Sequence, residues 1–127
     1  IRDRWKHYWD TERQWRTTSR LSVMMSRDNG SGYFDYERAL FREQVRWKNG
    51  EWTISAGARL GWYRYLRQKI GAENRYRSYA LLDCRAERML GRYWMLFAAG
   101  EHEWSDSNDP RDNYQSWQVS TGIGVEY

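Results

Sequence analysis

Apolar and polar side chains alternate along three stretches of the chain, and this period of two decides the fold class. The stretches are residues 15–26, 51–62 and 116–127. In the last one, Trp117, Val119, Thr121, Ile123, Val125 and Tyr127 fall on one side. A helix would spread these residues around its axis, whereas a β-strand places them on one face. The pattern therefore predicts β-strands with one apolar and one polar face.

Three noisier alternating stretches occupy residues 33–48, 76–89 and 92–104. Asn49-Gly50 is a strong hairpin signal, and residues 90–92 read as a second tight turn. The sequence thus predicts an all-β chain, an antiparallel meander of about six strands within residues 15–127. Residues 1–14 are expected to add a strand or to extend the first one.

The remaining connections, at residues 27–32, about 66–75 and 105–113, are longer and more polar. In a meander, all three lie at one end of the sheet and the short turns lie at the other. Transmembrane β-barrels have this asymmetry, with short periplasmic turns and longer extracellular loops.

Composition narrows the class further. The mean hydropathy is −1.05, yet 17% of the residues are aromatic, which argues against disorder. Aliphatic residues are too few for an ordinary core, and no apolar run is long enough for a transmembrane helix. The net charge is +4, but basic residues are interleaved with acidic ones. We therefore expect no nucleic acid partner.

Aromatic residues cap the apolar stripes, which is typical of the girdles that transmembrane barrels place at the membrane interfaces. The alternative is core packing in a soluble sandwich, but the residues between the caps are small and pack a dry core poorly. The residues predicted to face lipid or form girdles are Trp15, Trp52, Trp62, Trp94, Trp104, Trp117, Ile123, Val125 and Tyr127.

The polar faces are basic in the first three strands and mainly acidic in the last three. If they line a lumen, the solute meets opposed charges; alternatively, pairs such as Arg59 with Asp83 neutralise each other in a plugged interior. The predicted lumen-lining residues are Arg16, Arg20, Arg42, Arg46, Arg59, Asp83, Arg85, Glu87, Glu101, Glu103 and Gln118.

The C-terminal strand, ending on Val125 and Tyr127, resembles the targeting strand of bacterial outer-membrane proteins. The stretch 105–110, followed by Tyr114, is similar to the last external loop of porin-like barrels. The resemblance implies location in the bacterial outer membrane, contact with its lipid and lipopolysaccharide, and recognition by the barrel assembly machinery. It also implies a porin-like channel for passive diffusion of small polar solutes.

Six strands cannot close such a barrel, since single-chain bacterial barrels start at about eight. The chain begins at Ile1, without an initiator Met or a signal peptide. We therefore expect a processed or incomplete chain, with further strands upstream or in other chains. The alternatives are an outer-membrane barrel enzyme, an export barrel, or a soluble β-barrel that binds an apolar ligand.

Catalysis is not expected, because His102 and Ser105 point to opposite faces of a strand. No cofactor or metal is expected either. Asp106, Asn108, Asp109 and Asp112 could offer oxygens to calcium, but Pro110 breaks the loop pattern and favours an Asx-rich turn. Glu43 lies on an apolar face, which indicates a bulge, a protein contact or an error of phase.

Overall fold

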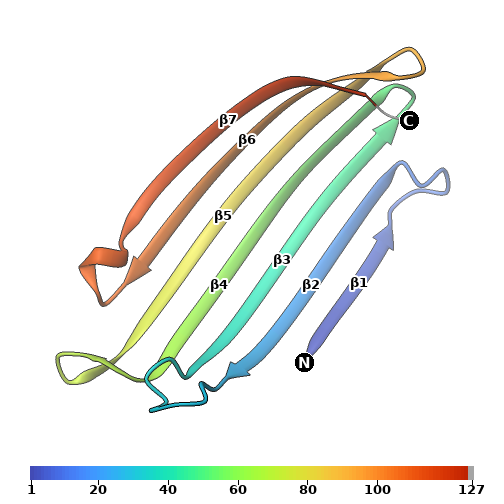
Figure 1. Cartoon of the computed structure of the whole chain (residues 1–127). Helices are drawn as coiled ribbons and strands as arrows, with labels where there is room; N and C mark the ends of the chain where they lie inside the picture. Colours follow the sequence, from blue (N-terminus) through green and yellow to red (C-terminus); the bar gives the residue numbers. More distant parts are fainter. Residues whose placement is uncertain (126–127) are drawn as a thin grey trace.

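The computed structural model describes residues 1–125 and consists of one curved antiparallel sheet (Figure 1). Tyr127, predicted to end the last apolar stripe, lies outside the described residues. The strands are β1 (Arg2–Tyr8), β2 (Trp15–Ser26), β3 (Tyr36–Asn49), β4 (Trp52–Ile70), β5 (Glu73–Leu90), β6 (Trp94–Ser107) and β7 (Tyr114–Val125). A short 3-10 helix, η1 (Pro110–Asp112), precedes β7.

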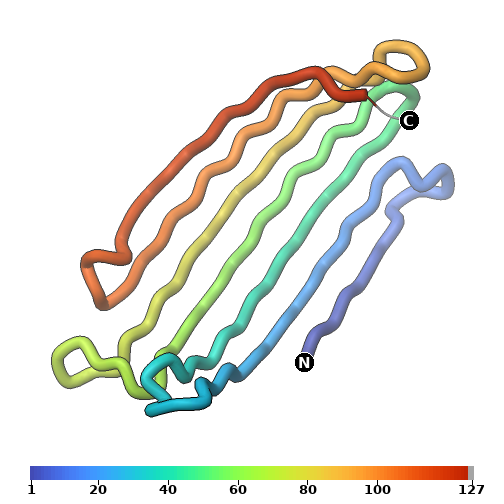
Figure 2. The backbone as a smooth tube through the Cα atoms, viewed as in Figure 1, coloured from blue at the N-terminus to red at the C-terminus, as the bar shows by residue number. Residues whose placement is uncertain are grey.

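Each strand pairs with its neighbours in the sequence, in the order β1 to β7. The prediction of an all-β antiparallel meander is therefore confirmed. The sheet has seven strands rather than about six, because β1 forms within residues 1–14. Figure 2 shows the backbone as a single layer, and β1 and β7 do not pair with each other within residues 1–125.

The prediction of a long loop at residues 66–75 is wrong. β4 continues to Ile70 and β5 begins at Glu73, so only a tight turn separates them. Gly71 takes the positive φ, +63°, that this turn needs. The register shifts between Arg64 and Lys69, and this irregularity hides the strand, because it breaks the alternation from which strands are recognised.

The other connections at this end of the sheet are held by their own polar groups. The Asp28 carboxylate accepts hydrogen bonds from the backbone N–H groups of Gly30, Gly32 and Phe34. These hydrogen bonds hold the pKa of Asp28 below its ordinary value, and the bond from Phe34 has the largest effect. Buried Gln68 donates to the Tyr33 carbonyl, which joins this loop to the extended β4–β5 hairpin.

Burial is inverted relative to a soluble sheet. Along β4, apolar Ile54, Leu60 and Trp62 are exposed, while Arg59 on the other face is half-buried. Leu81 is the only large apolar side chain buried among residues 1–125. The sheet therefore has no apolar core, and its polar face forms the hollow side.

Candidate functional site

The strand register divides the side chains into two faces, because directly paired residues of an antiparallel sheet point the same way. All eleven predicted lumen-lining residues share the face that we call the polar face. From β2 to β7 they are Arg16, Arg20, Arg42, Arg46, Arg59, Asp83, Arg85, Glu87, Glu101, Glu103 and Gln118.

Arginines on the polar face lie in a line across the first four strands. Arg4 is directly opposite Arg20, Arg20 is opposite Arg42, and Arg42 is opposite Arg59. We call these four residues the arginine row. The alternation of β2 to β4 predicts their common face, but only the register reveals that they are aligned.

The basic character extends beyond the row. None of the residues on the polar face of β1 to β4 is acidic. Arg38 of β3 belongs to this face, as the alternation of residues 33–48 predicts. Arg2, Arg4 and Lys6 of β1 also belong to it but were not among the predicted lumen-lining residues. The signal was present in β1, where Arg2, Arg4 and Lys6 alternate with Asp3, Trp5 and His7.

Acidic residues occupy the polar face of the neighbouring strands. Asp83 of β5 lies directly opposite Glu101 of β6, so like charges are again adjacent. Arg85 lies within the acidic region; its Nε donates to Glu87 at 2.6 Å, and its guanidinium lies 4.2 Å from the centre of the Phe97 ring. The polar face is thus divided into a basic half and a mainly acidic half.

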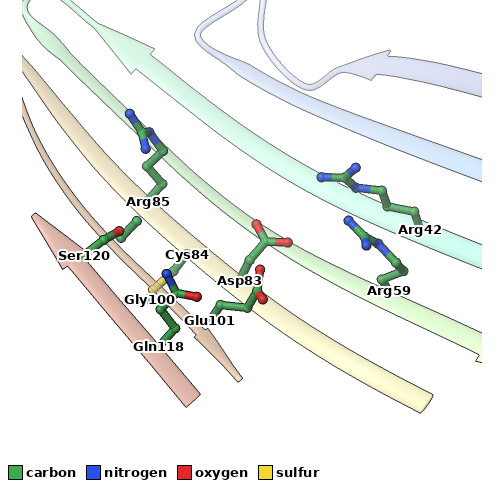
Figure 3. A pocket seen from close by; sticks show the side chains of 10 residues that line it. Arg42, Arg59, Asp83, Cys84, Arg85, Gly100, Glu101, Gln118 and Ser120 are labelled. Atoms are coloured by element: carbon green, nitrogen blue, oxygen red, sulfur yellow. The ribbon is translucent and has the colours of Figure 1, made fainter. Parts of the chain in front are cut away.

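The two halves meet in a hollow of about 290 Å³ (Figure 3). Arg42 and Arg59 line one part of it, and Asp83, Glu101 and Gln118 line another. No nitrogen of Arg59 lies within 4.0 Å of an Asp83 oxygen among the ion pairs of residues 1–125. The alternative of a plugged interior predicted an ion pair between Arg59 and Asp83, and this pair is not formed.

The opposite face, which we call the apolar face, carries the predicted girdle and lipid-facing residues that the structure describes. They are Trp15, Trp52, Trp62, Trp94, Trp104, Trp117, Ile123 and Val125. On β4 the apolar stripe begins at Trp52 and ends at Trp62. That length matches the about 9–11 residues a tilted strand needs to cross a membrane. One step further, Arg64 pairs with Glu37.

Glu43 lies on the apolar face, directly opposite Ser19 and Ala58. The register on both sides of β3 runs without a shift. A bulge and an error of phase are therefore both excluded as explanations of its position. The carboxylate lies opposite small side chains, midway along the apolar stripe. Of the three explanations that the sequence offered, only a contact with another protein is left.

His102 and Ser105 are not arranged as a catalytic pair. The His102 ring packs on Trp104, with ring centres 3.9 Å apart, on the apolar face. Ser105 is buried on the polar face, where its hydroxyl accepts a hydrogen bond from Arg77.

The acidic loop before β7 is satisfied by its own chain. Asp109 accepts from the backbone N–H and the side chain of Arg111, and Asp112 accepts from Arg75. The Arg111 bonds hold the pKa of Asp109 below its ordinary value, and the positive charges of Arg111 and Arg75 add to this. Within residues 1–125, no cluster of three metal-ligating side chains occurs.

Comparisons of the chain with protein-family models, with curated proteins and with solved structures find no match. Among the described residues, no helix has both the length and the apolar character needed to cross a membrane. The class is therefore defined by the fold alone: an open antiparallel meander with an exposed apolar face and a charged, hollowed polar face.

Proposed function

We propose that this chain forms part of the wall of a bacterial outer-membrane β-barrel, a porin-like channel through which small polar solutes diffuse. The observation that carries the proposal is the inverted burial of the sheet. The apolar face is exposed between rows of Trp, and the charged face lines the hollow.

Lipid is the environment that suits such an apolar face. Soluble monomers rarely expose a contiguous apolar surface of this extent. Here Leu60, Leu82, Val119 and Ile123 are all at least half exposed, Ile123 at 66%. Trp residues at both ends of the β4 stripe fit the interfacial belts of a membrane strand.

The direction of the apolar face, on the outer side of the curved sheet, also argues against a soluble barrel with an apolar ligand inside. Such a barrel would direct Ile54 and Ile123 towards a common interior, whereas both are exposed on the outer side of the curved sheet. The charged hollow, with Arg42, Arg59 and Asp83 in its lining, suits a hydrated polar solute.

The two edges of the sheet require partners in a membrane. β1 and β7 each have one side without a neighbouring strand within residues 1–125. Every unpaired N–H or C=O group costs several kcal/mol in hydrocarbon. Under this proposal, further strands of the same polypeptide or of other chains complete the wall.

Reconstitution of the complete polypeptide tests the proposal. We expect it to fold into lipid vesicles, to migrate differently on gels with and without heating, and to give steps of ionic conductance in planar bilayers. The matched control is the protein with Ile54 and Ile123 replaced by Asp, which keeps the polar face but should not insert. A wild-type protein that folds in water without detergent and never conducts would overturn the proposal.

A further inference from the structure

The arginine row places like charges in direct opposition three times in succession. Directly opposite cross-strand neighbours have Cβ atoms about 4.5–5.5 Å apart, and like charges there are destabilising. Arg4, Arg20, Arg42 and Arg59 nevertheless face one another across β1 to β4. The four positive charges therefore repel one another, and a bound anion would relieve this repulsion.

No carboxylate of the described chain neutralises the row. The ion pairs within residues 1–125 involve Arg64, Arg75, Arg85, Arg88 and Arg111, and none of the four row residues. Elsewhere on the polar face, four residues along the strand from Arg20 and Arg42 respectively, the Nε atoms of Arg16 and Arg38 are also buried without a hydrogen-bond partner among the described residues. Unsatisfied buried donors of this kind indicate a missing acceptor.

The row lies inside the height of the apolar stripe. Arg59 falls between Trp52 and Trp62 of β4, the two ends of that stripe, and points to the other face. An anion bound there is surrounded by the wall of the barrel rather than by lipid headgroups. Its source is therefore a solute in the lumen.

The geometry favours an elongated anion with several phosphate groups. A guanidinium binds phosphate through two parallel N–H···O bonds, and its planar fork suits phosphate recognition better than an ammonium does. The four arginines lie in a line across adjacent strands about 5 Å apart, so an elongated anion with several linked phosphates can bridge neighbouring guanidinium groups. A single small anion would satisfy only one or two of them.

We propose that the arginine row is a binding site for oligophosphate-bearing solutes, set across the lumen of the channel. This inference rests on the proposed porin-like function for its setting. The binding site itself is testable without conductance, because a folded protein in detergent still presents the polar face.

The probe is inorganic tripolyphosphate, compared with orthophosphate and with citrate. By titration calorimetry on the complete polypeptide folded in detergent, we expect tripolyphosphate to bind more tightly than either comparison anion. Arg42→Gln removes one of the two inner charges of the row and should weaken binding by roughly tenfold or more, because it deletes charge-assisted hydrogen bonds. The matched control is Arg92→Gln, which removes the same charge in the β5–β6 turn and should leave binding unchanged.

We expect the variant to fold, since Arg42→Gln relieves the repulsion of Arg42 from Arg20 and Arg59. Its thermal transition without anion should equal or exceed that of the wild type, and tripolyphosphate should raise the transition of the wild type more. Equal binding of citrate and tripolyphosphate, or equal weakening by Arg92→Gln, overturns the site. Conductance without tripolyphosphate binding overturns this inference alone. Binding without conductance supports the site and counts against the channel.

Discussion

Tyr79 lies directly across the β4–β5 pair from Gly61, and its ring occupies the space that a Cβ at residue 61 would need. Gly61 is buried beneath the ring on the polar face. Gly122 and Phe97 repeat this relationship across β6 and β7. Glycine on this face thus provides room for a large side chain of the next strand.

We therefore expect Gly61→Ala to displace the Tyr79 ring and to lower the free energy of unfolding by about 1–3 kcal/mol, the usual cost of overpacking. Urea titration of the protein in lipid vesicles, followed by Trp fluorescence, measures this. Gly100→Ala is the control, because the nearest atom to a Cβ there is the Cys84 sulfur at 3.6 Å, an ordinary contact. Equal losses in both variants would contradict the packing argument.

Replacement of Ile123 by Arg tests the facing of the last strand. Ile123 lies on the apolar face and Ser120 on the polar face of β7. In a membrane, Ile123→Arg should cost about 2–4 kcal/mol if the side chain lies near the midplane. Ser120→Arg, which adds the same charge towards the hollow, should cost much less. The two variants are compared by the same unfolding measurement, and a reversed order would place lipid on the other face.

Alternation was sufficient to predict the faces of β2 to β7, because side-chain direction in a strand depends on parity alone. It assigned Arg59 and Glu101 to one face and Trp62 and Trp104 to the other before any pairing was known. It failed only in the last part of β4, beyond Arg64, where the register shift before Lys69 moves later residues out of phase. Local sequence does not encode such a shift, since it depends on how β4 meets β5.

The alignment of the arginine row could not be predicted for a related reason. Parity places Arg20 and Arg42 on one face, but their direct opposition depends on the length and geometry of the loop between β2 and β3. For residues 1–14 the sequence left two possibilities, an added strand or an extension of the next one, because residues 2–8 carry charges on both faces. The structure has the added strand, β1, paired with β2.

Glu43→Leu should stabilise the folded protein in lipid if the apolar face at this position contacts only lipid. The carboxylate lies opposite Ser19 and Ala58 and makes no ion pair within residues 1–125. Removing it should raise the free energy of unfolding by about 1–2 kcal/mol, less than for a cationic residue. Glu37→Leu, at the charged border of the stripe beside Arg64, should have a smaller effect. A loss of stability or of self-association in Glu43→Leu would instead identify a protein contact at this residue.

Acid should loosen the loop before β7, because Asp109 holds it together in its charged form. The carboxylate accepts from the Arg111 N–H at 3.2 Å and from the Arg111 Nε at 3.2 Å, and Arg75 lies 4.0 Å away. These contacts lower the pKa of Asp109 below its ordinary value. For a carboxyl with a lowered pKa, the stabilisation is fully present above the unfolded value of about 3.9. It is lost as the pH falls through the lower, folded value.

The measurement is the rate of backbone amide hydrogen exchange at Asp112 and Asn113, whose N–H groups donate within the loop, in the reconstituted protein from pH 5 down to pH 2. Asp109→Asn is the reference at each pH, since it never carries the charge and the intrinsic exchange conditions are the same for both proteins. At pH 5 we expect these amides to exchange several-fold more slowly in the wild type than in Asp109→Asn, roughly the effect of losing one charge-assisted hydrogen bond. The ratio of the two rates should approach one at pH 2. Asp106→Asn removes an exposed carboxylate of β6 nearby and should track the wild type throughout. A rate ratio that stays constant with pH would show that the charge of Asp109 does not hold the loop.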